Sequence, residues 1–226
     1  MKKWERFQNS NLFQAWLVLL LSLVFGTALA GVEVFLGPKI EANKIKETME
    51  KVPVVILGAS KAEEMTSAGN SLSIEPFTIE IEKNKRKKSY TVYKANFKDG
   101  TLAGFVVKAS VQGYADKIEL LVGLDSKVKA ITGLFVLDQK ETPGLGNKIV
   151  EEDWQSQFVT QPLNKPLVVV KNGSGKVFEI DAISGATISS RCVTDLVNQT
   201  VADLKEKLVL LEAKKEQKEK GEDIDG

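Results

Sequence analysis

Thr187 lies at the junction of a small-residue stretch and an amphipathic segment. The stretch reads Asp-Ala-Ile-Ser-Gly-Ala-Thr at 181–187 and continues directly into residues 188–211. Apolar residues in that segment recur at three- and four-residue steps, which is typical of a helix with one apolar stripe. The stripe comprises Val193, Leu196, Val197, Val201, Leu204, Leu208 and Leu211. The pattern therefore places Thr187 at or just before a helix N-terminus.

The start of a helix favours an anion, because its first backbone N–H groups lack partners and the helix dipole is positive there. A threonine hydroxyl is a poor nucleophile unaided, but it is a good point of attachment for a phosphate. Gly185 lets the backbone turn and come close to a ligand. From these residues alone two interpretations stay open: an ordinary N-cap, which is common before an apolar run, and a phosphate attachment site at Thr187.

A second group of turn-forming residues lies at 141–149, where the sequence is Glu-Thr-Pro-Gly-Leu-Gly-Asn-Lys-Ile. Pro143 restricts Thr142 to an extended conformation, while Gly144 and Gly146 allow close backbone approach. Taken alone, a Pro-Gly-x-Gly turn indicates only a loop.

Together the two strings resemble the FMN-binding domain family. The family motif Asp-x-x-Ser/Thr-Gly-Ala-Thr is complete at 181–187, and the Glu-Thr-Pro-Gly-Leu-Gly loop is the second family motif. Gly113-Tyr114, and Trp154 with Phe158, also fit the family. The resemblance covers about residues 77–211, and it implies that Thr187 carries FMN through a phosphoester bond.

A flavin tethered only by its phosphate would swing freely, so its ring needs a wall. On the resemblance we expect this wall at 141–148, with apolar contact from Pro143 and Leu145 and with backbone donors. The charge of Lys148 or Glu141 would tune the ring electronically. The candidate cofactor-binding residues are Asp181, Ser184, Gly185, Ala186, Thr187, Glu141, Thr142, Pro143, Gly144, Leu145, Lys148 and Arg191.

Arg191 follows Thr187 by one helical turn. It is either a partner of the phosphodiester or an exposed surface residue. Cys192 is expected to be a buried small hydrophobe and not a reactive thiol. No residue is expected to make or break bonds once the flavin is attached, so we predict no catalytic residues.

Within the family, the chain resembles the G subunits of Rnf-type ion-translocating ferredoxin:NAD oxidoreductase complexes. The C subunits of sodium-translocating NADH:quinone reductases share both motifs but are generally longer. The resemblance implies other membrane subunits as partners and a flavin transferase that uses FAD as donor. Three alternatives stay open: a stand-alone exported electron carrier, a C subunit of a sodium-translocating NADH:quinone reductase, and an anchored sensor whose Ser-Gly-Ala-Thr turn holds a phosphate-containing ligand.

Composition excludes several classes of chemistry. The chain has 226 residues, with 31 Lys and Arg against 30 Asp and Glu, and this net charge of +1 gives no indication of nucleic-acid binding. With no histidine, Ser-His-Asp hydrolysis and imidazole metal sites are excluded. A single cysteine holds neither an intrachain disulfide nor an iron–sulfur cluster. Redox chemistry would therefore depend on an organic cofactor, and no metal site is predicted.

The N-terminal region predicts a membrane anchor. Residues 12–36 carry Glu33 as their only charge and are long enough to span a bilayer. The alternative is a cleaved signal peptide, because Ala28-Leu29-Ala30 before Gly31 has the form of a cleavage site. The apolar character continues beyond Ala30, which favours an uncleaved anchor. The basic residues in 1–11 predict that this end is cytoplasmic and that the rest lies outside a bacterial-type plasma membrane.

The remaining chain predicts an α+β domain at 74–211, preceded by a juxtamembrane helix and linker at 37–73 and followed by a charged flexible tail or frayed helix at 212–226. The juxtamembrane helix is expected at 38–52, with Pro38 in its first turn. Short connections between alternating strands predict a mainly antiparallel sheet. A strand is expected at 77–81, followed by a basic turn at 83–88. Three hairpins are expected: 90–97 with 105–109 through Lys98-Asp99-Gly100, 118–124 with 128–137, and 167–170 with 177–180.

Overall fold

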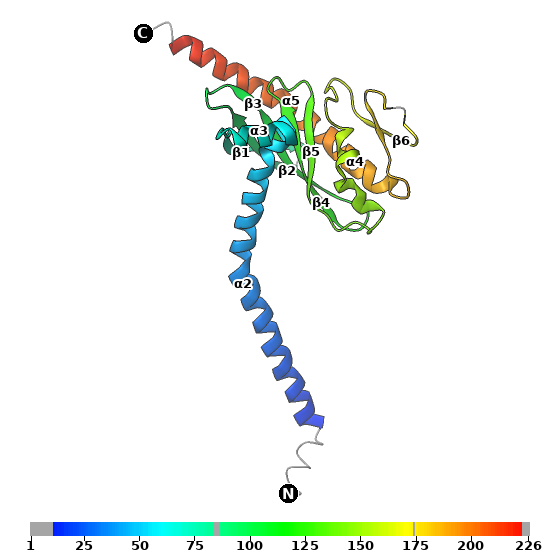
Figure 1. The fold of residues 1–226 in the computed structure, drawn as a ribbon. Helices are drawn as coiled ribbons and strands as arrows, with labels where there is room; N and C mark the ends of the chain where they lie inside the picture. The colour runs from blue at the N-terminus through cyan, green and yellow to red at the C-terminus, as the bar shows by residue number, and fades with distance from the viewer. Residues whose placement is uncertain (1–10, 84–85, 174, 223–226) are drawn as a thin grey trace, which may run out of the picture. The chain divides into compact units, whose positions relative to one another are not determined.

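The computed structural model of the chain describes residues 11–83, 86–173 and 175–222. Two compact units make up the chain, Met1–Glu47 and Thr48–Gly226. The elements follow in the order α2 (Asn11–Leu57), α3 (Ala59–Ser67), β1 (Ser73–Lys83), β2 (Arg86–Asn96), β3 (Leu102–Gln112), β4 (Lys117–Asp125), β5 (Ile131–Asp138), η1 (Gly146–Val150), α4 (Glu152–Ser156), β6 (Val168–Val170), β7 (Glu179–Asp181) and α5 (Thr187–Glu222) (Figure 1).

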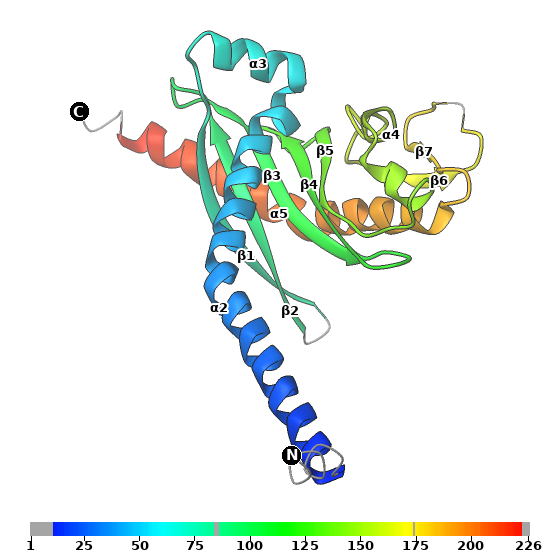
Figure 2. The same ribbon diagram turned by 60° about the horizontal axis from the view of Figure 1, so that its bottom comes forward.

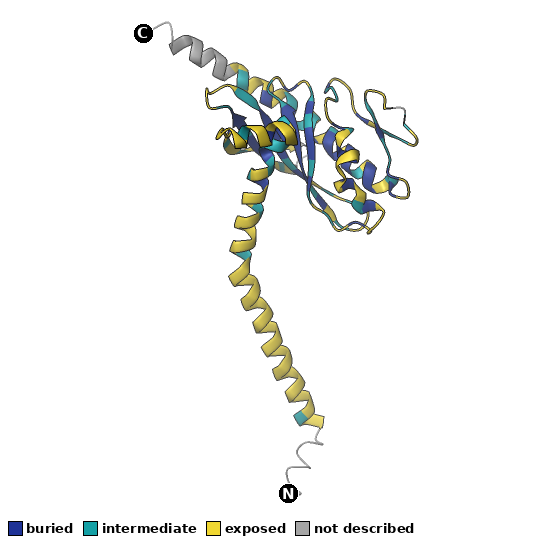
Figure 3. Ribbon diagram, in the orientation of Figure 1, coloured by how far each residue is buried: buried dark blue, intermediate teal, exposed yellow. Residues whose placement is uncertain are grey.

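The first unit is formed by the N-terminal part of α2, a helix of 47 residues. Its most apolar stretch has a mean hydropathy of 2.2, and none of that stretch is buried within the protein (Figure 3). Such a stretch is stable in a bilayer, where its side chains meet hydrocarbon and its backbone is fully hydrogen-bonded. By length and composition, α2 is therefore a membrane-anchoring helix.

The expected separate juxtamembrane helix is continuous with this span. Pro38 lies in the interior of α2 and not in a first turn. A proline removes one backbone hydrogen bond and kinks a helix, but the helix continues where the flanking turns hold it. The basic residues Lys2, Lys3 and Arg6, on which the expected orientation depends, lie outside the described residues.

The second unit is built on a five-stranded antiparallel sheet in the order β1-β2-β3-β4-β5. This confirms the predicted α+β class with a mainly antiparallel sheet. The first hairpin pairs Lys83 with Arg86, so residues 86–88 of the expected basic turn belong to β2 instead. Residues 84–85 lie outside the described part of the chain. The second hairpin turns at Lys98-Asp99-Gly100, as predicted.

The hairpin between β4 and β5 begins its second strand later than expected, at Ile131 instead of Val128. The carboxylate of Asp125 accepts hydrogen bonds from the backbone N–H groups of Lys129 and Ala130, at 2.6 and 2.8 Å. Val128 has a φ of 52°, in the left-handed region. These contacts form a wide turn, so the strand starts only after it.

Each face of the sheet is covered. On β3, Phe105 and Val107 join the larger core cluster with α5, while Val106 points to a smaller cluster with the end of α2. Figure 2 shows α5 crossing one face of the sheet, with α3 and the C-terminal turns of α2 on the other. The strand is buried on both faces because its residues are apolar at successive positions.

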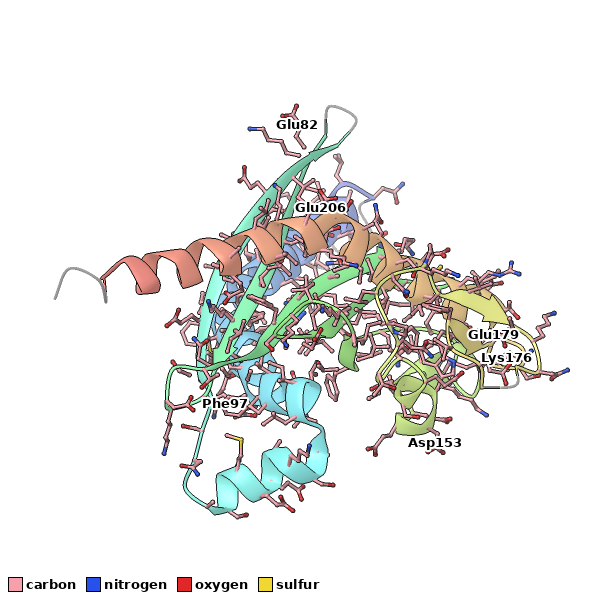
Figure 4. The ribbon with its side chains drawn as sticks, turned by 90° about the horizontal axis from the view of Figure 1, so that it is seen from above. Glu82, Phe97, Asp153, Lys176, Glu179 and Glu206 are labelled. Atoms are coloured by element: carbon pink, nitrogen blue, oxygen red, sulfur yellow. The ribbon has the colours of Figure 1, made fainter. Side chains whose placement is uncertain are left out.

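The expected third hairpin is wrong, because β6 and β7 pair in parallel, with Val169 opposite Ile180. The connection leaves β6 through Asn172 at φ 54° and enters β7 through Phe178 at φ 72°. These two left-handed residues turn the chain back on itself before β7 begins, so a short connection here does not produce an antiparallel pair. In Figure 4, Lys176 and Glu179 mark this end of the domain, where α5 begins.

The helix predicted at 188–211 is confirmed and is longer than expected. It starts at Thr187 and continues to Glu222, through most of the segment expected as a charged tail or frayed helix. Its N-terminal part carries the apolar residues of the larger core, among them Val193, Leu196 and Leu204. Residues 223–226 lie outside the described range.

Candidate functional site

Thr187 is the first residue of α5 and is half-buried. The turn before it is held by Ser190, whose hydroxyl accepts a hydrogen bond from the Ile183 N–H at 3.1 Å and donates one to the Ala186 carbonyl at 3.0 Å. The Ser190 N–H makes an early helical hydrogen bond, to the Ala186 carbonyl at 3.1 Å. The N–H groups of the three residues before Ser190, in the first turn of α5, have no acceptor within the helix.

The strand that leads into this turn is fixed from the α4 region. Trp154 donates its indole N–H to the Asp181 carbonyl at 2.9 Å, and the Asp181 N–H donates to the Gln157 side chain at 2.6 Å. The rings of Trp154 and Phe158 pack edge to face at 5.3 Å. Trp154 and Phe158 follow the 141–149 loop in the sequence. Trp154 thus holds the strand that leads into the motif turn, and Phe158 packs against Trp154.

Glu141 connects three separate segments. Its side chain is 4% exposed. One carboxylate oxygen accepts the N–H groups of Ala115 and Asp116, at 3.0 and 3.5 Å, and the other accepts the hydroxyl of Ser189 in the first turn of α5. Because a buried carboxylate is costly unless its oxygens are hydrogen-bonded, these contacts fix the relative positions of the three segments.

Two glycines make room for this carboxylate. A Cβ on Gly113 would lie 2.5 Å from the Glu141 Oε1, and one on Gly146 would lie 2.9 Å from its Oε2. Both distances are shorter than real Cβ contacts, so a larger residue at either position would displace Glu141. The glycines of these loops therefore serve the packing of Glu141 at least as much as the approach of a ligand.

The three segments and the motif turn enclose a cavity of about 590 Å³. This volume lies within the range of small-molecule sites. The lining residues are Tyr114, Glu141, Thr142, Leu145, Gly146, Lys171, Gly185, Ala186, Thr187, Ile188 and Ser189. The structure thus brings the two sequence motifs, far apart along the chain, to one cavity.

Leu145 is the apolar contact between the two motifs. It is 43% exposed, and its Cδ2 lies 2.8 Å from where a Cβ would stand on Gly185. Besides this close contact, the φ of 79° at Gly185 also favours glycine, because other residues seldom adopt it. Leu145 therefore lies over the motif turn with part of its surface open to the cavity.

Several expected site residues are not among the residues that line this cavity. They include Pro143, Gly144, Lys148, Ser184 and Arg191, and all five of these are exposed. The Asp181 side chain has one buried oxygen, Oδ1, without a hydrogen-bond partner among the described residues. Arg191 thus fits the surface alternative that the sequence left open.

Five lining residues are not among the site candidates that the sequence indicates, and one of them, Gly146, lies inside the second motif. Ile188 and Ser189 directly follow Thr187, so their position at the start of the helix was a usable signal. Lys171 comes from the β6–β7 connection, and Tyr114 from the β3–β4 turn. Of these last two, only Tyr114 had a sequence signal, its place beside Gly113.

Among the described residues that line the cavity, two carry charged side chains. One is Glu141, whose carboxylate oxygens both accept hydrogen bonds, and the other is Lys171. Cys192 is half-buried, and burial together with the nearby carboxylates of Glu141 and Asp195 raises the pKa of its thiol. The thiol is therefore protonated at neutral pH, but Cys192 is not the fully buried hydrophobe that the sequence predicts. No group of three or more metal-ligating side chains occurs within the described ranges.

Residues 113–202 match the FMN-binding domain family. The chain is 40% identical over 109 residues to the G subunit of the ion-translocating oxidoreductase complex of Methanosarcina acetivorans, covering 48% of this chain and 55% of the relative. It is 36% identical over 135 residues to the G subunit of the Na⁺-translocating ferredoxin:NAD⁺ oxidoreductase complex of Acetobacterium woodii, covering 57% and 61%. The matched region thus spans little more than half the length of these relatives.

Two solved structures share the fold. One is NqrC of Shewanella oneidensis, with a TM-score of 0.55 and 21% identity over 70% of this chain and 91% of that one. The other is the C subunit of the Na⁺-translocating NADH-quinone reductase of Parabacteroides distasonis, with a TM-score of 0.56 and 21% identity over 75% and 94%. Together with the apolar helix α2, the comparisons support FMN as the cofactor and a membrane location.

Proposed function

We propose, from the premise that residues 113–202 form an FMN-binding domain, that this chain is a membrane-anchored electron carrier with FMN bound covalently to Thr187. The observation that carries the proposal is the position of the Thr187 hydroxyl. It stands at the first residue of α5 and lines a cavity of about 590 Å³ with the second sequence motif.

The residues around Thr187 fit a phosphate. The N–H groups in the first turn of α5 and the positive end of its dipole stabilise an anion there. Lys171 adds a full positive charge to the same cavity. When a flavin transferase uses FAD as donor, the Thr187 Oγ loses its proton and forms the bond to phosphorus, and AMP leaves.

The rest of the cavity fits a flat ring. Leu145 supplies apolar surface, and Thr142 and Gly146 line the side of the cavity that the 141–146 loop forms. Bound FMN would supply the one- and two-electron chemistry of the carrier. The protein residues hold the ring in place, exclude water from one side and set the charge around it.

We further propose that the chain works as the G subunit of an Rnf-type complex, which couples electron transfer between ferredoxin and NAD to ion movement. The support is similarity to two G subunits, one named for an ion-translocating oxidoreductase complex and one for a Na⁺-translocating ferredoxin:NAD⁺ oxidoreductase complex. Its partners would then be other membrane subunits, and a flavin transferase would be needed for maturation. In this role the FMN domain lies outside the cytoplasm.

The attachment is tested by intact-mass measurement of the full-length chain expressed with and without a flavin transferase. We expect a mass increase of one FMN phosphoester only with the transferase, and none in Thr187→Val, which keeps the shape but lacks the oxygen. Thr200→Val is the matched control, since Thr200 is buried farther along α5 and does not line the cavity. Covalent flavin on Thr187→Val would exclude Thr187 as the attachment site.

The complex is tested separately, by purifying the tagged chain from mild detergent extracts of its native membrane. Stoichiometric recovery of several multi-spanning membrane proteins with the flavinylated chain is the expected result. Recovery of the flavinylated chain alone would support the stand-alone carrier. A phosphate-containing ligand that is lost on denaturation would instead support the anchored sensor.

A further inference from the structure

Tyr114 is a large exposed side chain at the proposed flavin cavity. It is 66% exposed, and it lines the same cavity as Thr187 and Leu145. Among the described lining residues it is the one aromatic side chain. Neither sequence motif contains it, because it comes from the connection between β3 and β4.

The turn that carries Tyr114 is held firmly although its side chain is exposed. The Gly113 N–H donates to the Asp116 carbonyl at 2.9 Å, which closes the turn around Tyr114. The N–H groups of Ala115 and Asp116 then donate to one oxygen of Glu141, at 3.0 and 3.5 Å. The backbone on both sides of Tyr114 is thus fixed to a buried carboxylate.

The same carboxylate is also fixed to the helix that carries Thr187. Its second oxygen accepts the hydroxyl of Ser189, in the first turn of α5. Gly146 leaves room for this contact, since a Cβ there would lie 2.9 Å from both the Glu141 Oε2 and the Ser189 Oγ. One side chain therefore sets the position of the tyrosine turn relative to the attachment point.

We propose that Tyr114 is the aromatic wall against which the flavin ring lies, and that Glu141 is the positioning residue that holds this wall. The inference rests on the proposed attachment of FMN to Thr187. In the proposed attachment, the phosphate of FMN lies at the start of α5. The phenol ring of Tyr114 is uncharged and does not bind a phosphate, so we expect it to contact the flavin ring. Offset or edge-to-face contact between aromatic rings is favourable beyond the area that it buries.

Tyrosine gives this contact a spectroscopic signature. An excited flavin takes an electron from a touching tyrosine ring, and the electron then returns, so emission is quenched without net chemistry. Phenylalanine is much harder to oxidise and does not quench in this way. A tyrosine that only supports the fold would not affect the fluorescence lifetime of the flavin.

The test is the flavin fluorescence lifetime of the full-length chain in detergent, after intact mass has shown one FMN per chain. We expect Tyr114→Phe to lengthen the mean lifetime severalfold while leaving the ring wall in place. Tyr93→Phe is the matched control, because Tyr93 is buried in the cluster on the other face of the sheet. Its lifetime should equal that of the unaltered chain.

The positioning role of Glu141 is tested with two substitutions. Glu141→Gln keeps an oxygen for the Ala115 and Asp116 N–H groups, and its amide can donate to Ser189 Oγ, so the short lifetime should persist. Glu141→Ala releases the tyrosine turn, and we expect a longer lifetime and lower fluorescence anisotropy. A short lifetime in Glu141→Gln together with a longer one in Glu141→Ala would show that the hydrogen bonds of residue 141, and not its charge, position Tyr114.

The outcomes distinguish this inference from the proposed function. Absence of the FMN mass in the unaltered chain with the transferase would refute the attachment itself. A flavinylated Tyr114→Phe variant with an unchanged lifetime would refute the Tyr114 contact alone. A flavinylated Glu141→Gln variant with the lifetime of Glu141→Ala would refute the positioning role of Glu141.

Discussion

Lys171 is the cation that the described chain presents to the proposed flavin cavity, and its charge should tune the flavin potential. A reduced flavin carries negative charge near its pyrimidine end, so a nearby cation stabilises the reduced form and raises the potential. We expect Lys171→Gln to lower the midpoint potential by an amount on the order of tens of millivolts, since the site is partly open to water. Redox titration of the flavinylated chain measures this shift.

Lys148→Gln is the control for this prediction. Lys148 is exposed on η1 and does not line the cavity, and the change removes the same charge from the chain. Equal shifts for the two variants would show that only the overall charge matters. A larger shift at Lys148 would restore the tuning role that the sequence predicts for it.

Leu145 should affect the flavin more than the fold. Because it is 43% exposed, Leu145→Ala should cost about 1 kcal/mol or less of folding stability, below the value for a fully buried leucine. The substitution removes the apolar contact over Gly185, so a bound ring becomes more mobile and better solvated. We expect an altered midpoint potential and slower electron exchange with the partner. Unchanged values in a flavinylated variant would remove the loop from the site.

At the residue scale, the sequence motifs indicate the proposed attachment point but not the whole cavity. Thr187 and Leu145 lie in contiguous strings, which a single chain displays directly. Lys171 lines the cavity from the connection between β6 and β7, a pair whose parallel direction the sequence did not indicate. The role of Glu141 depends on hydrogen bonds to Ala115 and Ser189, far from it in sequence, so no local pattern identifies it.

At the element scale, the C-terminal turn of α2 packs directly against a pair of glycines in the sheet. Gly123 and Gly133 are directly opposite each other on β4 and β5. A Cβ on Gly133 would clash with the Val55 carbonyl oxygen, which also accepts the hydroxyl of Thr132 at 3.0 Å. The helix backbone therefore approaches the sheet as closely as glycine permits.

Gly133→Ala should lower the folding stability, because it disturbs the packing of α2 against the sheet. The new methyl group must push Val55 away from the sheet, and overpacking of this kind costs about 1–3 kcal/mol. Chemical denaturation of the full-length chain in detergent measures the loss, with Ser110→Ala on an exposed position of β3 as control. A Gly133→Ala variant as stable as the control would show that the helix end adjusts without cost.

Element type was easier to predict from the sequence than element pairing. Alternation and turn residues predicted the strands of the large sheet and the start of α5, because both patterns are local. The β6–β7 pair was mispredicted since its direction depends on two left-handed residues, Asn172 and Phe178, and non-glycine residues seldom adopt that conformation. The unbroken helix through Pro38 likewise opposes the local preference of proline.

At the scale of the whole molecule, the proposed electron transfer depends on which side of the membrane holds the flavin domain. Lys2, Lys3 and Arg6 precede the apolar span, and the positive-inside bias places them in the cytoplasm. We expect Lys98→Cys, in the exposed β2–β3 turn of a chain that also carries Cys192→Ser, to react with an impermeant maleimide from outside the cell. Labelling only after access from the cytoplasmic side would reverse the orientation.

The same span decides whether the proposed carrier remains anchored in the membrane. Ala28-Leu29-Ala30 has the form of a cleavage site, but α2 continues as helix on both sides of it, and the apolar run extends past Gly31. A signal peptidase needs an extended segment, and unwinding a helix here would leave backbone groups unpaired in the bilayer. We therefore expect the mature protein to keep residues 1–30 and to remain in the membrane fraction after a high-salt wash. An N-terminus at Gly31, found by sequencing the mature chain, would contradict this and would support a released carrier that meets its partners by diffusion.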